Sequence, residues 1–454
     1  MKHPDISSVN VLGLGKSGVS AAKLADRLGL RISAFDEKEP ADMQALSKEI
    51  SPDRLQLFPK WIGDKLPSCS LNVVSPGISK DSALWKAAVN SGAEIVSELE
   101  FAYRFLEAPI IAITGTNGKT TTTEMLSFLL GKEGMRAPSA GNIGVPLSDF
   151  ASSCEKYDII VVEVSSFQLE NCTSFAPVSA ALLNITSDHM NRYSDFDDYA
   201  ATKFRVFNGI RPKENMVIRK DLLPLWKKFL PASPGPMTFS GTEHDADFHV
   251  GNDSRLCIEK NGRPCSFMNM SECALKGVHN AENILAATSM VLSVIPDADP
   301  LKIGKNVCEF RTGPHRMELV AEFNKVKYIN DSKATNPDSV VAALNSIAGT
   351  GNVCLIMGGL DKNMDFSTLL QHSGKIKSIF LLGESKKKLA NLFEGYIYYK
   401  MYDDFEDAVI AASSATEPGD VVLLSPGCAS MDMFQDYRER GNKFIEIVNG
   451  RIRK

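Results

Sequence analysis

The sequence has no apolar run that approaches the roughly 20 residues of a membrane-spanning helix. Residues 1–5 lead into no apolar signal region, so we expect a cytoplasmic protein without a membrane partner. The excess of one charge sign over the other is also small, because the formal net charge is -5. No block of basic residues could neutralise a nucleic-acid backbone. We therefore expect small-molecule partners and no nucleic acid.

Paired cysteines are missing too. The nine cysteines, among them Cys69, Cys154, Cys172, Cys354 and Cys428, form no C-x-x-C pair, and several lie in apolar runs. An odd number of scattered cysteines argues against a complete disulfide framework. The pattern predicts reduced thiols in the core of the protein.

What the sequence does have is length and alternation. A chain of 454 residues, 44% of them apolar, is too long for one core and favours about three domains. Short apolar runs alternate with helical patterns, which is typical of parallel α/β sheets. We expect an α/β protein with a Rossmann-like domain over 1–107, a central phosphate-loop domain over 108–312 and a Rossmann-like domain over 313–454. Polar alternation near 239–273 predicts a small antiparallel insert in the central domain.

A glycine turn lies between an apolar segment and a helical pattern in the expected central domain. Residues 109–114 are apolar and β-branched, and Gly115, Thr116, Asn117, Gly118, Lys119, Thr120 and Thr121 follow. In a phosphate-binding loop the backbone N–H groups converge on phosphate oxygens, and the helix N-terminus adds positive charge. Lys119 would contact the outer phosphates and Thr120 would bind magnesium. The commonest such loop has about four residues between its glycines; here only Thr116 and Asn117 separate them, so a glycine turn with a surface lysine is the alternative.

Two further residues follow apolar strands at the same expected sheet edge. Glu163 ends the run 158–163, and His189 follows the run 178–184. A carboxylate at the tip of a neighbouring strand commonly holds the magnesium that bridges nucleotide phosphates. Glu163 is therefore a candidate metal ligand, with a solvated strand-end charge as the alternative. His189 is a candidate ligand or orienting group, and a structural histidine is its alternative.

Four segments, in this order, resemble the central domain of the Mur ligases: 114–120, 163–169, 184–190 and 201–203. The resemblance implies ATP, two magnesium ions, and a catalytic group of Lys119, Glu163, His189 and Lys203. It also implies that Lys203 is carbamylated, which would turn a cationic amine into an anionic oxygen ligand for the second magnesium. A surface lysine on a helix is the alternative for Lys203.

The last third of the chain extends the resemblance to the Mur ligases that add D-glutamate. The segments that carry it are 313–318, 330–336, 358–362 and 424–432. The resemblance implies ATP contacts from Asn280, Asn283, Arg316 and Asp331. It also implies D-glutamate contacts from Lys333, Thr335, Lys362, Ser430 and Tyr437, although Tyr437 stands where the family has phenylalanine. Lysines and hydroxyls suit a dianionic amino acid, whereas helix-cap asparagines and solvated loop lysines are the alternatives.

The first domain carries a second glycine pattern. Residues 13–18 fit G-x-G-x-x-G after a strand, and Asp36 ends the next strand, which alone would favour a nicotinamide or flavin enzyme. The Mur ligases use this domain for the uridine diphosphate of the acceptor, whose phosphates can meet the same turn. The resemblance assigns the acceptor's UDP group to Gly15, Lys16, Ser17, Asp36, Ser75, Pro76, Gly77, Asn142 and Ser165.

The reaction that the resemblance implies is ATP-dependent joining of D-glutamate to UDP-N-acetylmuramoyl-L-alanine by a monomeric enzyme of peptidoglycan precursor synthesis. Three alternatives stay open. Another Mur-type or folate-polyglutamate ligase would share the central loop, a nicotinamide oxidoreductase would use the first glycine pattern, and a nucleotide switch would hold ATP without an amino acid.

Overall fold

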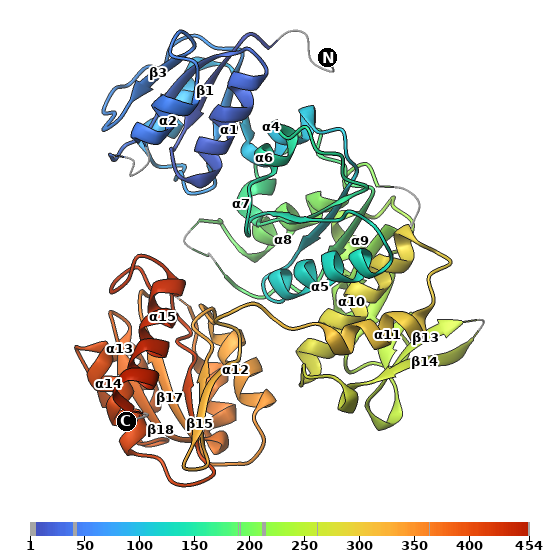
Figure 1. The fold of residues 1–454 in the computed structure, drawn as a ribbon, viewed down its shortest axis with the longest axis vertical. Helices are drawn as coiled ribbons and strands as arrows, with labels where there is room; N and C mark the ends of the chain where they lie inside the picture. Colours follow the sequence, from blue (N-terminus) through green and yellow to red (C-terminus); the bar gives the residue numbers. More distant parts are fainter. Residues whose placement is uncertain are drawn as a thin grey trace. The chain divides into compact units, whose positions relative to one another are not determined.

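The computed structural model describes residues 6–39, 43–188, 190, 192–210, 215–260, 262–362 and 364–452. Contacts within the chain define two compact units. The first comprises Met1–Ile185, Asp197–Cys273 and Asn280–Phe310, and the second comprises Thr186–Phe196, Ala274–His279 and Arg311–Lys454. Two sheets belong to the first unit and one to the second (Figure 1). The chain is an α/β protein, as its alternating pattern predicts.

The first sheet has five parallel strands in the order β3-β2-β1-β4-β5. Its strands are β1 (Ser8–Leu12), β2 (Arg31–Phe35), β3 (Leu55–Phe58), β4 (Leu71–Val74) and β5 (Glu94–Ser97), and its helices are α1 (Lys16–Arg27), α2 (Met43–Glu49), α3 (Ala83–Ser91) and α4 (Glu98–Phe105). The order is that of a Rossmann-like half, with the chain leaving central β1 for the helix that begins at Lys16. The glycine turn at 13–15 therefore lies at the carboxyl edge of the sheet.

The second sheet has nine strands in the order β14-β13-β12-β11-β10-β9-β6-β8-β7. They are β6 (Ile110–Thr114), β7 (Ser139–Gly141), β8 (Ile160–Glu163), β9 (Ser179–Leu182), β10 (Met216–Arg219), β11 (Met237–Ser240), β12 (Phe248–Val250), β13 (Arg255–Lys260) and β14 (Arg263–Asn269). Pairs from β7 to β12 are parallel, and only the β12–β13 and β13–β14 pairs are antiparallel. The expected antiparallel insert is this hairpin, which extends the central sheet instead of forming a separate flap.

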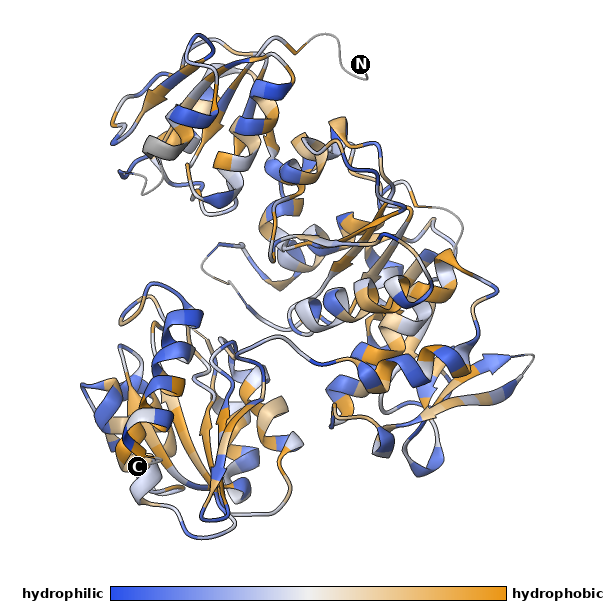
Figure 2. Ribbon diagram, viewed as in Figure 1, coloured by the Kyte–Doolittle hydropathy of each residue, from blue (hydrophilic) through white to orange (hydrophobic). Residues whose placement is uncertain are grey.

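The helices that accompany the second sheet in the chain are α5 (Lys119–Lys132), α6 (Leu147–Ala151), α7 (Ser166–Leu169), α8 (Phe196–Phe204), α9 (Leu223–Phe229), α10 (Val278–Val294) and α11 (Pro300–Glu309). Central β6, β8 and β9 are buried at every residue, as expected of parallel strands covered on both faces. Apolar residues accordingly run along the strands, and polar residues lie on the outer helices (Figure 2).

The third sheet has six strands in the order β15-β16-β20-β17-β18-β19. Its strands are β15 (Glu318–Phe323), β16 (Val326–Asn330), β17 (Val353–Gly358), β18 (Ile376–Leu382), β19 (Tyr399–Met401) and β20 (Val421–Leu424), and its helices are α12 (Pro337–Ser346), α13 (Lys386–Phe393), α14 (Phe405–Ser414) and α15 (Tyr437–Ile447). Only β15 runs antiparallel to its neighbour. One core contains residues of α12 and α13, and a second contains residues of α14 and α15.

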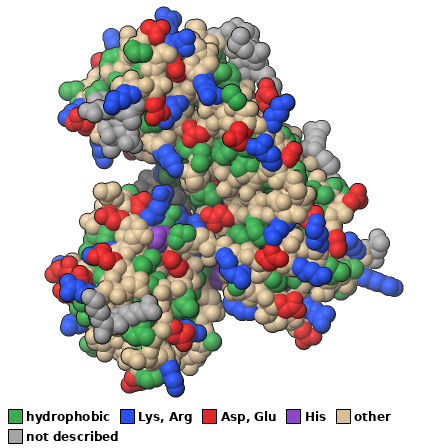
Figure 3. Space-filling model, viewed as in Figure 1, with side chains coloured by type: hydrophobic (Ala, Val, Ile, Leu, Met, Phe, Trp, Pro, Cys, Tyr) green, Lys and Arg blue, Asp and Glu red, His purple; other side chains and the backbone are tan. Residues whose placement is uncertain are grey.

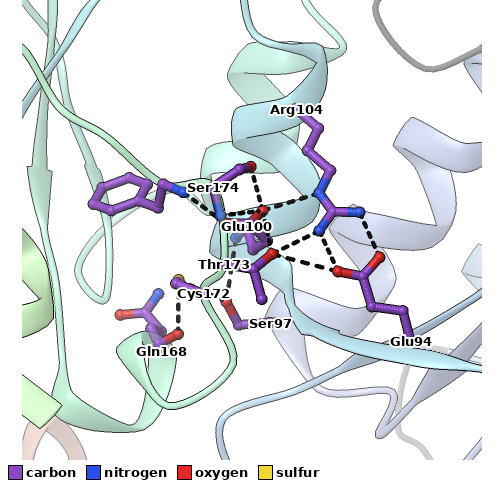
Figure 4. A network of polar contacts seen from close by, with 9 residues as sticks. Glu94, Ser97, Glu100, Arg104, Gln168, Cys172, Thr173 and Ser174 are labelled. Atoms are coloured by element: carbon purple, nitrogen blue, oxygen red, sulfur yellow. Dashed lines mark hydrogen bonds and ion pairs between the residues drawn. The ribbon is translucent and has the colours of Figure 1, made fainter. Parts of the chain in front are cut away.

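A buried ion-pair network fastens the first sheet to the second within the same compact unit (Figure 4). Glu100 of α4 accepts hydrogen bonds from Arg104 Nε at 2.9 Å, from Ser174 N at 3.0 Å and from Phe175 N at 2.9 Å. Arg104 also pairs with Glu94 through Nη2 at 2.6 Å. A buried carboxylate with this many donors is fully compensated, so the network holds α4 against the loop after α7.

The distribution of surface charge and the state of the cysteines agree with most of what the amino-acid composition predicts. Acidic and basic side chains are interspersed over the face shown in Figure 3. Within the described part of the chain, no helix combines the length and apolar character needed to cross a bilayer. All nine cysteines are free thiols. Cys154 and Cys265 are exposed, so the expectation of core thiols is wrong for these two.

Candidate functional site

The turn at 115–118 joins a buried strand to a long helix. All five residues of β6 are buried, and Gly118 caps α5 with φ +81°. A Cβ atom on Gly118 would lie 2.3 Å from Asn283 Oδ1, so both backbone and space require glycine there. Lys119 Nζ donates to the carbonyl oxygens of Gly115 at 2.9 Å and Thr116 at 2.8 Å. Thr120 and Thr121 lie buried in the first turn of α5.

Asn184 holds the turn from the strand on one side. It follows β9, which pairs with β6, and its Oδ1 accepts from Thr116 N at 3.1 Å and Asn117 N at 2.7 Å. Its Nδ2 donates to the Asn117 carbonyl at 3.0 Å. This side-chain clamp fixes a loop whose backbone would otherwise be free to rearrange.

Glu163 lies at the tip of the strand on the other side. It pairs with Ile113 across β8 and β6 and is 2% exposed. Its Oε1 accepts from Asn142 Nδ2 at 2.7 Å, whereas Oε2 has no hydrogen-bond partner in the described structure, and neither has Thr114 Oγ1. An uncompensated buried carboxylate oxygen is costly, and a cation would compensate it. The alternative of a solvated strand-end charge is therefore wrong.

Carboxylate and hydroxyl oxygens of this kind fit Mg²⁺, which prefers oxygen ligands and retains waters. Among the residues with described positions, no group of three or more His, Cys, Asp and Glu could hold a metal. A divalent ion here would thus rely on Glu163, threonine hydroxyls, water and phosphate oxygens. His189, the other candidate ligand from the sequence, lies outside the described residues.

Lys203 is buried beside the glycine turn. It lies on α8, about one helical turn after Tyr199, and is 2% exposed. Its Nζ donates to the Gly115 carbonyl at 2.8 Å. Its Nζ lies 4.8 Å from the centroid of the Tyr199 ring, and the Tyr199 hydroxyl is 3.1 Å from Thr116 Oγ1. The alternative of a surface lysine is therefore wrong.

Asn280 and Asn283 lie inside α10, which begins at Val278, so the alternative of helix-cap residues is wrong. Asn283 is buried and its Oδ1 accepts from Thr122 Oγ1 at 3.2 Å. Asn283 Nδ2 lies 3.4 Å from Asn280 Oδ1. The structure therefore brings the two asparagines against the helix that follows the glycine turn.

The turn at 13–18 is built differently. A Cβ atom on Gly18 would lie 1.8 Å from the Gly13 carbonyl oxygen, so the helix can approach the turn only with glycine there. Gly15 caps α1 without a side-chain bond, and the Lys16 ammonium contacts the Gly144 carbonyl. The carboxylate of Asp36 accepts from Leu14 N at 2.7 Å and Lys38 N at 2.8 Å, so both oxygens already bind backbone.

The other residues assigned to the acceptor lie around these two turns. Ser75 Oγ donates to the Gly13 carbonyl at 2.7 Å. Ser17 and Pro76 are half-buried, whereas Gly77 and Asn142 are exposed. Ser165 caps α7 in a reciprocal capping box with Gln168. Its hydroxyl therefore has a structural task in this conformation.

In the second compact unit, Asp331 follows β16 and is buried. Its oxygens accept from Met317 N at 3.2 Å and Ser425 Oγ at 2.9 Å. Burial raises the pKa of Asp331 to about 7, and the charge of Arg316 acts in the opposite direction. An uncharged or hydrogen-bonding partner such as a sugar hydroxyl suits this carboxyl better than an anion.

The amino-acid candidates of this unit lie on converging segments. Lys333 Nζ is 4.0 Å from the centroid of the Tyr437 ring, a cation–π distance. Leu360 N donates to the Ala429 carbonyl at 2.9 Å, which joins the segment of Lys362 to that of Ser430. Ser430 is buried, whereas Thr335 and Lys362 are half-buried.

Comparison with known proteins places this geometry in a family. Three family models match in chain order: "Mur ligase MurD-like, N-terminal domain" over 7–97, "Mur ligase middle domain" over 113–291 and "Mur ligase, glutamate ligase domain" over 315–428. The UDP-N-acetylmuramoylalanine--D-glutamate ligase of Caldicellulosiruptor saccharolyticus is 38% identical over 450 residues, covering 97% of this chain and 98% of the relative. The chain belongs to the Mur ligase family. The ligase of the same name from Thermoanaerobacter pseudethanolicus is 37% identical over 448 residues, covering 97% of each chain.

Solved Mur ligases share the fold. The UDP-N-acetylmuramate-alanine ligase MurC of Thermotoga maritima superposes with TM-score 0.63 at 18% identity, covering 97% of this chain and 99% of that one. MurF ligase of the same organism, in complex with ADP, gives 0.61 at 18% identity, covering 98% and 95%. The predicted α/β fold class is confirmed.

The structure of this Mur ligase adds three residues that the sequence argument missed. Asn184 clamps the glycine turn, Tyr199 contacts the turn and Lys203, and Arg440 lies buried among the segments of the amino-acid candidates. Asn184 could have been found by the strand-end argument that found Glu163. Tyr199 precedes Lys203 by one helical turn, which is also readable from sequence. Nothing local to Arg440 indicates its burial.

Proposed function

We propose that this chain joins D-glutamate to UDP-N-acetylmuramoyl-L-alanine with conversion of ATP to ADP and phosphate, a step of peptidoglycan precursor synthesis. The observation that carries the proposal is sequence identity of 38% and 37% to two D-glutamate ligases over nearly the whole length of the chain. The buried strand, glycine turn and helix at 110–132 support the use of a nucleoside triphosphate.

ATP would bind at the glycine turn. Lys119 now contacts carbonyls of its own loop, and phosphate oxygens would replace those partners as stronger, charged acceptors. We assign ATP contacts to Gly115, Thr116, Asn117, Gly118, Lys119, Thr120, Thr121, Asn280, Asn283, Arg316 and Asp331. The raised pKa of Asp331, which burial causes, is compatible with a hydrogen bond to a ribose hydroxyl.

Magnesium would be held by Thr120 and Glu163, with His189 and a carbamylated Lys203 completing the set for two ions. The free Oε2 of Glu163 supports the first assignment. Bound magnesium would neutralise phosphate charge and so lower the repulsion between ATP and the substrate carboxylate. Carbamylation of the Lys203 ammonium would form an N–C bond to carbon dioxide with release of two protons, and burial at 2% exposure would keep the product from bulk water.

The reaction would run in two steps. An oxygen of the L-alanyl carboxylate attacks the γ-phosphorus of ATP, the bond to ADP breaks, and an acyl phosphate forms. The neutral amine of D-glutamate then attacks the acyl carbon, a proton leaves the nitrogen, and phosphate departs from the tetrahedral intermediate. Lys119 and Arg316 would stabilise the charge on the transferring phosphoryl group.

We further propose that the uridine diphosphate meets Gly15, Lys16, Ser17, Asp36, Ser75, Pro76, Gly77, Asn142 and Ser165, and that D-glutamate meets Lys333, Thr335, Lys362, Ser430 and Tyr437. The start of α1 supports the first site, because no side chain caps this helix N-terminus and a helix N-terminus favours an anion. We also propose that the domain boundaries lie at 107/108 and 312/313, that the protein is a monomer and that it is located in the cytoplasm.

The test is ADP formation by the purified protein with UDP-N-acetylmuramoyl-L-alanine and one of four amino acids: D-glutamate, L-glutamate, L-alanine or diaminopimelate. We expect release that depends on D-glutamate and on the acceptor. Release with a different amino acid would identify another Mur-type ligase, and release without any amino acid would favour a nucleotide switch. Either result would overturn the proposed substrate.

A further inference from the structure

Arg440 is a buried guanidinium in the second compact unit. It lies on α15 and is 3% exposed. Its Nε donates to Ser332 Oγ at 3.0 Å, and its Nη2 donates to the carbonyl oxygens of Ser332 at 2.9 Å and Cys428 at 3.1 Å. In the described structure, none of these three hydrogen bonds goes to a carboxylate.

Such a charge is expensive to bury. Desolvation lowers the pKa of Arg440 to about 10, so the side chain stays cationic at neutral pH. Three neutral oxygens compensate a buried cation less well than a carboxylate does, and an apolar side chain of similar size would fill the space at lower cost. The fork geometry of arginine, which reaches two segments at once, is what an apolar residue could not reproduce.

The contacts of Arg440 coincide with the segments that bear the amino-acid candidates. Ser332 directly precedes Lys333, and Cys428 lies two residues before Ser430. The hydroxyl of Ser332 also donates to the carbonyl of Tyr437 at 2.8 Å. A Cβ atom on Gly359 would lie 3.3 Å from Arg440 Nη1, so the guanidinium also touches the segment that leads to Lys362.

We propose that Arg440 is a positioning residue for the amino-acid substrate: through Ser332 and Cys428 it fixes the spacing between Lys333 and Ser430. This inference rests on the proposed function, because it takes those residues to bind the two carboxylates of the amino acid. A dianion whose carboxylates are held at a fixed distance is sensitive to small shifts of either segment. Most of the contacts assigned to ATP lie in the other compact unit, so a shift of these segments should change ATP binding less, although Asp331 directly precedes Ser332.

A recess beside Arg440 makes a sharp experiment possible. It is small and partly open, and its lining includes Gly358, Gly359, Asp432, Phe434 and Arg440 itself. Truncating Arg440 would enlarge this space next to the oxygens that the guanidinium now binds. A free guanidinium ion has the size, charge and donors to take its place.

The experiment compares Arg440→Ala with Arg451→Ala, a matched control at an exposed arginine that pairs with Glu406. Michaelis constants for D-glutamate and ATP are measured with and without guanidinium chloride well below unfolding concentrations. We expect Arg440→Ala to raise the KM for D-glutamate about tenfold or more, as expected for lost charge-assisted bonds, while the KM for ATP changes less than about twofold. Added guanidinium should lower the raised KM for Arg440→Ala only.

A purely structural role would overturn the proposal. It would appear as an unchanged KM for D-glutamate, or as parallel changes for both substrates without recovery by guanidinium. If Arg440→Ala does not fold, Arg440→Lys and Ser332→Ala carry the test: each should raise the KM for D-glutamate selectively, and an unchanged value refutes the inference. If the wild type uses a different amino acid, the proposed function fails, and the same comparison made with that amino acid still decides the role of Arg440.

Discussion

The turns at 13–18 and 115–118 both join a buried strand to a helix in the same compact unit, yet their charged side chains do different things. At the first turn, Asp36 uses both oxygens to hold backbone amides, and Lys16 reaches away to the Gly144 carbonyl. At the second, Lys119 folds onto its own loop, and Glu163 keeps one buried oxygen without a described partner.

The difference shows that the glycine pattern sets the backbone conformation of each turn. The side chains at the ends of neighbouring strands set which ligands the turn can bind. A carboxylate saturated by amides fixes a loop, whereas a buried carboxylate with a free oxygen is suited to a cation. The carboxylate at the first turn thus has a structural role, whereas the second turn combines an ammonium with a buried carboxylate that could bind a metal ion. Four predictions test this contrast.

The largest effect should come from Lys119→Met. Removing the ammonium at the second turn takes away a donor to the transferring phosphoryl group, so kcat should fall about 10²–10³-fold. Lys132→Met on the same helix is the control, since Lys132 pairs at the surface with Glu309. Steady-state ADP release measures both, and equal activity of the two variants would refute the role of Lys119.

Glu163→Gln should weaken activation by Mg²⁺ about 10–100-fold, because an amide is a poorer cation ligand than a carboxylate. Without metal, the variant should unfold at the same or a higher temperature than wild type, since it no longer buries an uncompensated charge. Thermal unfolding across a Mg²⁺ titration checks both statements. Wild-type-like stabilisation of the variant by Mg²⁺ would argue that the ion binds elsewhere.

Asp36→Ala should act on the fold of the first turn. It leaves the amides of Leu14 and Lys38 without their acceptor, which should lower the free energy of unfolding by about 1–3 kcal/mol. Mg²⁺ activation should stay unchanged, in contrast to Glu163→Gln. Urea denaturation gives the stability, and a shift in the Mg²⁺ midpoint would break the proposed division of labour.

The smallest expected effects are changes in the free energy of unfolding on substitution of one glycine in each turn. Gly118→Ala forces a side chain into a left-handed backbone beside Asn283 and should destabilise by about 1–2 kcal/mol. Gly15→Ala meets no atom within 4 Å and has an extended backbone, so its stability should stay within about 0.5 kcal/mol of wild type. Matching losses in both variants would show that the two turns are equally strained.

Much of the architecture could be read from local patterns. The buried central strands have continuous apolar runs such as those within 109–114 and 178–184, so their existence and type were predicted. Short edge strands such as β3, β7 and β19 were missed, because few of their residues are buried and their pattern is weak. The antiparallel hairpin was predicted, but its attachment to the central sheet through β12 was not.

The candidate residues divide in the same way. The sequence by itself determined the order of strands, glycine turns and helices, and through motif resemblance the residue types at each expected site. Only the tertiary structure decided that Lys203 is buried against Gly115 and that both oxygens of Asp36 bind backbone amides. The same holds for the burial of Arg440 against the segments of Ser332, Gly359 and Cys428. Burial and hydrogen-bond partners are set by which strand ends and helices meet in space, and no local pattern encodes that meeting.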